Sequence, residues 1–393
     1  MDLEHKLDIL APAAGYEACD THSVAGRRYQ SKKAAWSNAP LGTEADAKGT
    51  PRPVLRLLMS AECIHDCPYC PLQRGRDVPR ATLTPEEVAT AVMPQLRRYD
   101  AGLLLSTAVA DSAEQSATGL VDSAVLLRTT HAYKGYLHLK LPPGVSHALI
   151  EAAARVSDRL SLNIEVPSAA HQTAIDPSRD WQRDVIARLA WMRDFQQAGL
   201  LKAGIATQFV VGAAGEDDKA LLDTTAWLHS ELGVRRVYYA AFQPIAGTPM
   251  ADQRATPAVR GLRLTQADWL LRHYGFTSGE IAGADNPLLS LHNDPKLAWA
   301  LRNPQYFPVE INTAPPEQLL RIPGLGPLGV KRIMRMRTLG RLREPMHISI
   351  LGAASRRVTD FVLFDGKFYG TGQTMRTARI AALRPLADQL SLW

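Results

Sequence analysis

Residues 54–70 read Val-Leu-Arg-Leu-Leu-Met-Ser-Ala-Glu-Cys-Ile-His-Asp-Cys-Pro-Tyr-Cys. The first seven of these residues have the length and apolar content of a short buried strand. Cys63, Cys67 and Cys70 follow with the spacing C-x3-C-x2-C. In a parallel barrel, the active site is built from loops at the carboxyl ends of the strands. This stretch therefore predicts a first strand that delivers three thiols to such a site.

Five later segments repeat the pattern of a short apolar strand, and helical patterns separate them. The expected strands are residues 103–109, 136–141, 161–166, 205–211 and 237–242. The expected helices are residues 84–99 with their N-cap, 144–157, 181–199 and 217–233. Six strand–helix alternations predict an α/β fold with a parallel sheet, in a closed or partial barrel or a doubly wound arrangement.

Polar side chains on two of the expected strands favour the barrel. Residues 136–141 and 161–166 each alternate apolar with polar positions. The polar positions are His138, Lys140, Ser161, Asn163 and Glu165. Because alternate residues of a strand face opposite sides, we expect the apolar set to pack against helices and the polar set to line the lumen. The alternative is a pair of edge strands with one wet face.

The chain has 393 residues, of which 46% are hydrophobic and 21% charged, as is ordinary for a globular protein of about two domains. A chain of this size buries enough surface to fold without disulfide bonds. No stretch approaches the ~20 uninterrupted apolar residues of a membrane span, and the first residues lack the pattern of a signal peptide. We therefore expect a cytoplasmic protein with no membrane partner. In that reducing compartment, clustered cysteines indicate metal rather than disulfides.

Composition divides the chain into five expected parts. They are an N-terminal extension (1–50) with a helix near residues 3–14, a barrel core (51–275) with a last helix near 265–274, a linker rich in Pro and Gly (276–295), a basic C-terminal domain (296–365) and a C-terminal tail (366–393). Residues 296–357 carry eleven Lys or Arg and three Asp or Glu, a net charge of +8 against +6 for the whole chain. This distribution indicates a polyanion-binding module, with a solvated basic face as the alternative.

The spacing of the three thiolates suits three irons of a cubane 4Fe–4S cluster. The usual fourth thiolate is missing, so one iron would stay open to a ligand from outside the protein. Zinc is the competing metal, but structural zinc requires four closed ligands, and no second C-x2-C or H-x3-H pair follows. Cys19 is far from the cluster in sequence, and we expect it to be an ordinary side chain.

The cysteine spacing, with Tyr69 directly before the last cysteine, resembles the radical S-adenosylmethionine (SAM) superfamily. The resemblance implies a partial (β/α)6 barrel, a 4Fe–4S cluster held by Cys63, Cys67 and Cys70, and SAM on the open iron. One electron from the reduced cluster then cleaves SAM, and the resulting 5′-deoxyadenosyl radical abstracts a substrate hydrogen. The resemblance also implies that Tyr69 borders the adenine and that a donor such as flavodoxin or ferredoxin supplies electrons.

Further SAM contacts implied by the resemblance lie at the polar strand ends. Many members hold the methionyl amine with a Gly-Gly-Glu run after the second strand, where this sequence has Leu-Ser-Thr-Ala-Val. That contact would then come from backbone groups or from Ser106 and Thr107. Asn163 and Glu165 are candidate ribose or methionyl partners, and Lys140 is a candidate contact for a carboxylate or a substrate phosphate. Simple polar filling of the barrel is the alternative for these residues.

Residues 311–337 resemble the helix–hairpin–helix motif of proteins that bind DNA without sequence specificity. Gly324 and Gly326 would allow a tight turn that points backbone N–H groups at a phosphate. Basic residues of the second helix would add charge there: Lys331, Arg332, Arg335 and Arg337. We expect a small all-helical C-terminal domain on this basis, with a hairpin that serves only packing or protein contacts as the alternative.

A narrower resemblance covers about residues 3–365 and points to DNA modification or repair radical SAM proteins. It rests on segments spread along the chain: 8–11, 79–82, 135–142, 160–167, 207–213, 236–239, 266–271, 294–302 and 307–313. Members of this subfamily are associated with a uracil-DNA-glycosylase-like protein, so the resemblance implies such a partner. It directs attention to nucleic acid without fixing a reaction.

The last five residues, Gln389-Leu390-Ser391-Leu392-Trp393, resemble the peptide by which proteins bind the bacterial sliding clamp. Leu390, Leu392 and Trp393 would enter an apolar pocket, and Gln389 would hydrogen-bond at its rim. The alternative is a tail that docks on its own domain.

Together these patterns predict a radical SAM enzyme that modifies or repairs DNA at a base or sugar position. The first alternative is an enzyme of the same chemistry that acts on RNA, because a helix–hairpin–helix grips phosphates rather than deoxyribose. The second is a non-catalytic adaptor that keeps a structural iron–sulfur cluster, binds nucleic acid and docks a DNA glycosylase.

Overall fold

The computed structural model describes residues 1–14, 41–45, 50–352, 354–373 and 376. Two compact units make up this part of the chain. The first contains Met1–Glu216 and Trp227–Gly261, and the second contains Asp217–Ala226 and the described residues from Leu262 onward. Within the described ranges, no helix is both long and apolar enough to cross a lipid bilayer.

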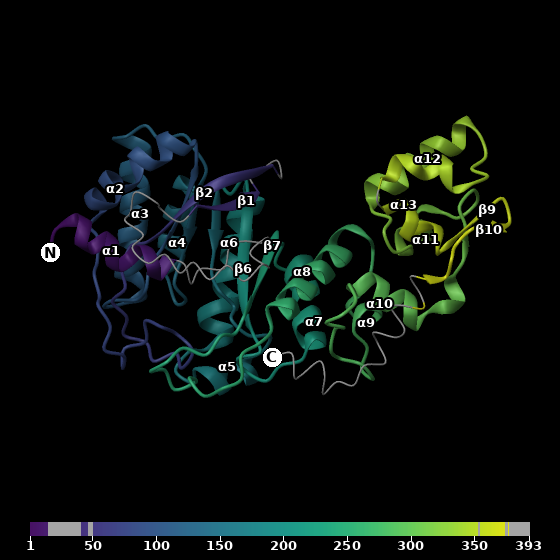
Figure 1. The fold of residues 1–393 in the computed structure, drawn as a ribbon. Helices are drawn as coiled ribbons and strands as arrows, with labels where there is room; N and C mark the ends of the chain where they lie inside the picture. Colours follow the sequence, from purple (N-terminus) through teal and green to yellow (C-terminus); the bar gives the residue numbers. More distant parts are fainter. Residues whose placement is uncertain (15–40, 46–49, 353, 374–375, 377–393) are drawn as a thin grey trace. The chain divides into compact units, whose positions relative to one another are not determined.

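The first unit is built around a sheet that has seven strands in the described residues, arranged side by side in sequence order (Figure 1). Strands β2 to β7 are parallel, and β1 pairs antiparallel with β2. The strands are β1 Leu41–Ala45, β2 Pro51–Leu58, β3 Gly102–Ser106, β4 Leu137–Lys140, β5 Arg159–Ser161, β6 Gly204–Val211 and β7 Arg236–Ala241. Parallel strands in this order, with helices between them, confirm the predicted α/β fold and its partial (β/α)6 barrel.

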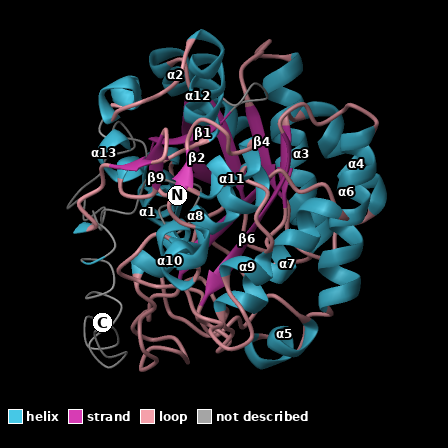
Figure 2. Cartoon of the chain, turned by 90° about the vertical axis from the view of Figure 1, so that its right-hand side faces the viewer, coloured by secondary structure: helices cyan, strands magenta, loops and turns pink. Residues whose placement is uncertain are grey.

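Helices cover the outer face of this sheet in the order α2, α3, α4 and α6, and Figure 2 shows α3, α4 and α6 side by side. The helices of the first unit are α1 Leu3–Ala14, α2 Pro85–Tyr99, α3 Ala113–Thr129, α4 His147–Val156, α5 Ala169–Ile175, the π-helical turn η2 Trp181–Ile186 and α6 Ala187–Gln197, whereas most of α7 Asp218–Ser230 and of α8 Ala258–His273 belongs to the second unit. The predicted cap of α2 is confirmed, because Thr84 Oγ1 accepts from the Glu87 N–H at 3.2 Å and Glu87 Oε2 accepts from the Thr84 N–H at 2.8 Å. Leucines of the outward strand face are fully buried beneath these helices: Leu103, Leu105, Leu137, Leu139 and Leu160.

The inner face of the sheet carries a buried network of polar side chains around Glu44. The register of β4 and β5 places His138 opposite Arg159, so the two residues share this face. Glu44 accepts from Tyr136 Oη at 2.7 Å and lies 3.0 Å from His138 Nδ1 and 3.5 Å from Arg159 Nη1. His138 Nε2 lies 2.7 Å from Ser161 Oγ. His138 and Ser161 face inward as predicted, and the edge-strand alternative is wrong because β4 and β5 have neighbours on both sides.

Strand β1 corrects the expectation that residues 1–50 form an irregular extension with one helix. It pairs with β2 and carries Glu44, which is 4% exposed, into the network. Burial alone would raise the pKa of Glu44, but the charges and hydrogen bonds of His138, Arg159 and the neighbouring tyrosine lower it to about 2 from an ordinary 4.5. Glu44 is therefore a carboxylate at neutral pH and closes the amino end of the barrel with an ionic contact.

The second unit contains a small sheet as well as helices, so the expectation of an all-helical domain is wrong. In the described residues its strands are β8 Val309–Glu310, β9 Val362–Phe364 and β10 Lys367–Phe368, in the order β10-β9-β8. Its helices are α9 Ser278–Ile281, α10 Pro295–Arg302, α11 Pro316–Arg321, α12 Pro327–Leu339 and α13 Ala354–Thr359, with 3-10 turns η3 Pro304–Tyr306 and η4 Pro345–Leu351. Strands this short do not hold the alternation from which a sequence pattern is recognised.

Residues 276–295, which we expected to be a linker, are part of the second unit. The Leu289 N–H donates to the Asp218 carboxylate at 2.8 Å, and the Lys219 N–H donates to Pro287 O at 2.9 Å. Pro and Gly mark turns, but they do not tell whether a segment packs against another element. Composition alone therefore misassigned this segment.

Lowering the pH tests the Glu44 network. Folding depresses the Glu44 pKa from 4.5 to about 2. The contribution of Glu44 to the free energy of unfolding is therefore complete above pH 4.5 and is lost as the pH falls toward 2. We expect Glu44→Gln to lower the free energy of unfolding by about 3 kcal/mol at pH 7, and this difference should narrow between pH 5 and pH 3. Urea unfolding followed by circular dichroism measures both values. Glu86→Gln, at an exposed position of α2, is the control, and a Glu44→Gln deficit that stays constant down to pH 3 would contradict the assignment.

Candidate active site at the carboxyl ends of the parallel strands

The three clustered cysteines lie on the loop that leaves the carboxyl end of β2. Backbone hydrogen bonds fasten this loop to the segment that follows β3. The Ala108 N–H donates to Ser60 O at 3.0 Å, and the Ile64 N–H donates to Val109 O at 2.8 Å. The loop therefore begins from a fixed position beside the end of the neighbouring strand.

The loop brings the three predicted iron ligands together. None of these three described cysteines is in a disulfide, and Cys67 is buried while Cys63 and Cys70 are half-buried. The Cys70 N–H donates to Cys67 O at 3.0 Å in a tight turn, and the Leu72 N–H donates to Cys70 Sγ at 3.4 Å. A backbone donor on a sulfur stabilises the thiolate form that binds metal.

The donor set suits a cubane cluster. Among the described residues, no three His, Cys, Asp or Glu side chains converge on the position of one metal ion. A cubane needs no such convergence, because each cysteine binds a different iron atom. Three thiols on one loop, without a fourth cysteine in the motif, fit a 4Fe–4S cluster that keeps one iron open.

Arg80 holds the cysteine loop from within. Its guanidinium donates to four backbone carbonyls, those of Ala61 at 2.7 Å, Leu72 at 3.0 Å, Gln73 at 2.7 Å and Arg76 at 3.2 Å. These carbonyls lie before and after the cysteines in sequence, so one side chain closes the loop around them. Hydrogen bonds from a charged donor contribute roughly 1.5–3 kcal/mol each.

Asp176 and Arg179 lie against Cys67, although sequence analysis did not single them out. The Cys67 thiol is 3.7 Å from Asp176 Oδ2 and 3.6 Å from Arg179 Nη2. The two charged groups are 3.5 Å apart, and their side chains are only 7% and 9% exposed. Both residues belong to the loop between α5 and η2, whose sequence Asp-Pro-Ser-Arg-Asp signals no more than a turn.

The surroundings of Cys67 control its protonation. Burial raises the pKa of the Cys67 thiol to about 12, and the Arg179 guanidinium opposes this rise. The thiol is therefore protonated at neutral pH before a metal binds, and metal binding must release this proton.

Tyr69 packs against an apolar cluster beyond the carboxyl ends of β5, β6 and β7. The cluster consists of Val166, Ile175, Ala213, Phe242 and Met250. Burial, together with the charges of Glu165 and Cys67, raises the pKa of Tyr69 well above its ordinary range. The phenol is therefore neutral, and its ring lies beside the cysteine loop.

Ser106 and Lys140 end β3 and β4. Ser106 is 1% exposed, and its Oγ has no hydrogen-bond partner within the described part of the chain. A buried hydroxyl without a partner is costly, so Ser106 is suited to receive a ligand. Thr107 differs, because its Oγ1 donates to Ala108 O at 2.7 Å. Lys140 is half-buried.

Asn163 and Glu165 follow β5, which ends at Ser161 and so is shorter than expected. Asn163 Nδ2 donates to Glu165 Oε1 at 3.1 Å. Glu165 has a φ of +63°, in the left-handed region that a residue with a side chain rarely adopts. Two backbone bonds to the neighbouring strand hold it there, from Glu165 N to Gln208 O at 2.9 Å and from Val210 N to Glu165 O at 2.8 Å. Strain of this kind, about 1–3 kcal/mol, is concentrated at functional sites.

In the second unit, a turn with Gly324 and Gly326 joins α11 to α12. Gly324 has a φ of +86°, which a side chain would strain. A Cβ on Gly324 would lie 3.3 Å from Arg357 Cβ, and a Cβ on Gly326 would lie 3.0 Å from Tyr274 Oη. The glycines therefore serve packing as well as the turn. Among the described side chains, none caps the first turn of α12 at Gly326, so the N–H groups there are suited to another acceptor.

Only part of the basic charge of the second unit faces solvent. The expected phosphate contacts exposed on α12 are Lys331, Arg332 and Arg335. Arg337 instead donates to the carbonyls of Ile311 and Ala314, at 2.7 Å each. The site residues Cys19, Gln389, Leu390, Leu392 and Trp393 lie outside the described residues.

Comparison with known proteins gives one curated relative with a partial match. No family model matches the sequence. A tRNA-2-methylthio-N(6)-dimethylallyladenosine synthase of Chloroflexus aurantiacus is 26% identical over 204 residues, which make up 50% of this chain and 42% of that protein. The chain therefore spans less than half the length of this relative.

Three solved structures each overlap with about half of the chain. A methylornithine synthase has 15% identity and a TM-score of 0.46, over 56% of this chain and 61% of that chain. HydG, a maturase of the FeFe-hydrogenase, has 16% identity and a TM-score of 0.45, over 56% and 49%. A radical SAM methyltransferase from Sphaerobacter thermophilus has 14% identity and a TM-score of 0.41, over 55% and 64%.

The match to the curated synthase agrees with the radical SAM resemblance of the cysteine loop. Radical SAM proteins use a 4Fe–4S cluster and S-adenosylmethionine, and the three cysteines on one loop are a donor set that fits this cluster. The substrate, the glycosylase-like partner and the role of the glycine turn stay predictions.

The contacts of Arg80 generate a test of the cysteine loop. Arg80→Met keeps the length of the side chain but leaves four carbonyls without their donor. We expect thermolysin to cleave the loop roughly 30-fold faster or more, since losing these bonds costs about 2–4 kcal/mol and each 1.4 kcal/mol is tenfold in the opening equilibrium. Cleavage sites and rates are read by mass spectrometry. Arg74→Met removes an exposed ion pair with Asp66 from the same loop and should change the rate little, whereas equal rates for all three proteins would remove Arg80 from this role.

Proposed function

We propose that this protein is a radical SAM enzyme that modifies or repairs DNA at a base or sugar position. The observation that carries the proposal is the buttressed loop of Cys63, Cys67 and Cys70 at the carboxyl edge of the parallel strands. The same chain carries a glycine turn followed by an exposed basic helix, which are features of a phosphate-binding module.

In this proposal the three cysteines hold three irons of a 4Fe–4S cluster, and SAM binds at the remaining iron. When bound, the cluster and SAM supply one-electron chemistry that removes a hydrogen atom from a substrate. The side chains of this protein bind and orient SAM. Tyr69 offers its ring to the adenine, Ser106 and Lys140 hydrogen-bond to polar groups of SAM, and Asn163 orients Glu165 through the 3.1 Å bond.

Water exclusion is the second task of the protein. The apolar cluster around Tyr69 and the buried Ser106 keep water away from the carboxyl ends of the strands. A dry site protects a reactive intermediate from side reactions and strengthens the few polar contacts made there.

DNA is the proposed substrate because of the second unit. The turn at Gly324 and Gly326 and the uncapped start of α12 are suited to bind a backbone phosphate, and Lys331, Arg332 and Arg335 add charge. Such contacts give affinity that depends on salt and tolerates any sequence.

RNA is the second candidate substrate, because the curated relative is named as a tRNA-2-methylthio-N(6)-dimethylallyladenosine synthase. A phosphate-binding turn serves either nucleic acid. Separate incubation of DNA and tRNA with the reduced protein and SAM, followed by mass spectrometry of the nucleosides, distinguishes the two substrates.

Three protein partners complete the proposal. They are a uracil-DNA-glycosylase-like protein, a sliding clamp bound through Gln389, Leu390, Leu392 and Trp393, and an electron donor such as flavodoxin or ferredoxin. A non-catalytic adaptor with a structural cluster is the competing function. Formation of 5′-deoxyadenosine from SAM under reducing conditions excludes the adaptor.

Removing one iron ligand tests the cluster. We expect Cys67→Ala, reconstituted without oxygen, to lose the absorbance of the cluster near ~400 nm and the formation of 5′-deoxyadenosine. Binding to DNA should remain, because α12 is untouched. Cys67→Ala that folds and retains the full absorbance would contradict the ligand assignment.

Removing two basic residues tests nucleic-acid binding. We expect Lys331→Ala with Arg332→Ala to weaken duplex binding and to reduce the slope of log K against log salt by roughly one per lost phosphate contact. Fluorescence anisotropy at several salt concentrations measures the slope. Lys134→Ala with Lys202→Ala, at exposed positions of the first unit, removes equal charge as the control, and the same slope for both double variants would remove α12 from the interface.

A further inference from the structure

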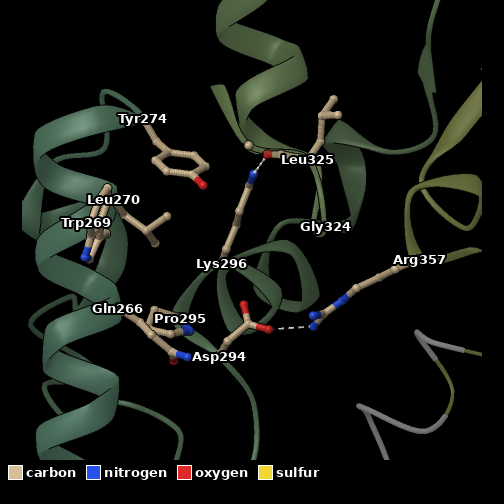
Figure 3. A pocket seen from close by; sticks show the side chains of 11 residues that line it. Gln266, Trp269, Leu270, Tyr274, Asp294, Pro295, Lys296, Gly324, Leu325 and Arg357 are labelled. Atoms are coloured by element: carbon tan, nitrogen blue, oxygen red, sulfur yellow. Dashed lines mark hydrogen bonds and ion pairs between the residues drawn. The ribbon is translucent and has the colours of Figure 1, made fainter. Parts of the chain in front are cut away.

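A cavity of about 310 Å³ lies in the second unit beside the proposed phosphate-binding turn. Figure 3 shows its walls: α8, the start of α10 and the turn that joins α11 to α12. Its volume is at the lower end of the range for sites that bind small ligands. The side chains that decide its chemistry are Trp269, Tyr274, Asp294, Lys296 and Arg357.

Lys296 is the unusual residue in this wall. It is 7% exposed, although lysine is almost never buried without a paired charge. Its Nζ donates to Leu325 O at 2.5 Å and lies 4.6 Å from the centroid of the Tyr274 ring (Figure 3). The nearby Asp294 carboxylate accepts from Arg357 Nη2 at 2.6 Å. An ammonium has three donors, so an acceptor brought by a ligand would complete the hydrogen bonding of Lys296.

The protonation of Lys296 agrees with an incomplete site. Burial lowers its pKa to about 7, and the charges of Arg321 and Arg357 add to this effect while Asp294 opposes it. A cation held at this cost inside a cavity is a common feature of binding sites.

Aromatic rings form another part of the wall. Trp269 is 45% exposed, which is unusual for so large an apolar side chain. The centroid of its ring lies 4.4 Å from that of the His273 ring. The Arg272 guanidinium carbon lies over the Trp269 ring, 5.2 Å from its centroid. Tyr274 reaches the glycine turn, where its Oη is 3.0 Å from the position of a Cβ on Gly326. The cavity therefore shares a wall with the proposed phosphate-binding turn.

We infer that this cavity binds one nucleotide, with its base against the rings of Trp269 and Tyr274 and one of its oxygen or ring-nitrogen acceptors on Lys296. The oxygens of Asp294 already accept from Arg357 Nη2 and from the Leu297 N–H, so this wall offers a base the donors of the Arg357 guanidinium. A base offers a planar ring and acceptors in one group, as these walls require. The inference rests on the proposed function, because a phosphate held at the glycine turn brings its own nucleotide to this wall.

Fluorescence of 2-aminopurine, a base whose emission falls on stacking, tests the inference with the full-length protein. The ligands are short single-stranded DNA and RNA that contain 2-aminopurine, and separately AMP and dAMP, so that a nucleotide within a strand is distinguished from a free one. We expect the wild-type protein to quench the emission. Trp269→Ala should abolish the quenching and weaken binding roughly 5- to 150-fold, as for one lost base–aromatic stack.

Two further variants sharpen the test. Lys296→Met should weaken binding of the same ligands, with circular dichroism to show that the variant folds. Trp227→Ala removes a tryptophan of similar exposure, 37%, outside the cavity and should change neither quenching nor affinity.

Failure of the inference is distinguishable from failure of the proposed function. If the single-stranded DNA and RNA ligands bind Trp269→Ala and Lys296→Met with wild-type affinity and quenching, the cavity is not a nucleotide site, while nucleic-acid binding stands. If AMP or dAMP binds through Trp269 but no strand binds, the cavity takes free nucleotide and the nucleic-acid substrate is wrong. If neither strands nor mononucleotides bind the wild-type protein, both are wrong.

Discussion

Parallel pairing of consecutive strands is the constraint on which the first unit depends. Because β2 to β6 run in one direction in sequence order, the segments that follow them meet at one edge of the sheet. The cysteine loop after β2, Ser106 at the end of β3 and Glu165 after β5 are thereby brought together across about a hundred residues of sequence. One residue, Arg80, then closes the cysteine loop by hydrogen bonds to backbone carbonyls on both sides of the thiols.

Buried polar groups have different partners at the two ends of this barrel. At the amino end, the Glu44 carboxylate is paired with Arg159, His138 and a tyrosine hydroxyl, so an ionic contact closes the lumen there. At the carboxyl end, Ser106 Oγ and Arg179 Nε have no hydrogen-bond partner among the described residues. Buried polar groups without partners are costly, and proteins retain them where a ligand supplies the missing contact. The ionic pairing of Glu44 marks the structural end of the barrel, and the Ser106 hydroxyl marks the end suited to chemistry.

The second unit uses the same residues for folding and for proposed recognition. Gly324 and Gly326 form the turn, and their missing side chains also admit Arg357 and Tyr274. The Arg337 guanidinium donates hydrogen bonds to backbone carbonyls, whereas the basic side chains Lys331, Arg332 and Arg335 of α12 face solvent. A net charge counted along the sequence therefore overstates the charge offered to a polyanion, because burial and internal hydrogen bonds consume part of it.

The sequence by itself determined the strand–helix alternation, the inward direction of His138 and Ser161 and the three clustered thiols, because period, caps and spacing are local properties. It did not reveal β1, the contacts of Arg80 or the Asp176–Arg179 pair beside Cys67. Glu44 and Arg159 are far apart in sequence, as are Cys67 and the pair beside it, and the short polar segments that carry these residues have no periodic signal. Only tertiary structure decided them, since the energy of a buried charge is set by the partners that other elements bring to it.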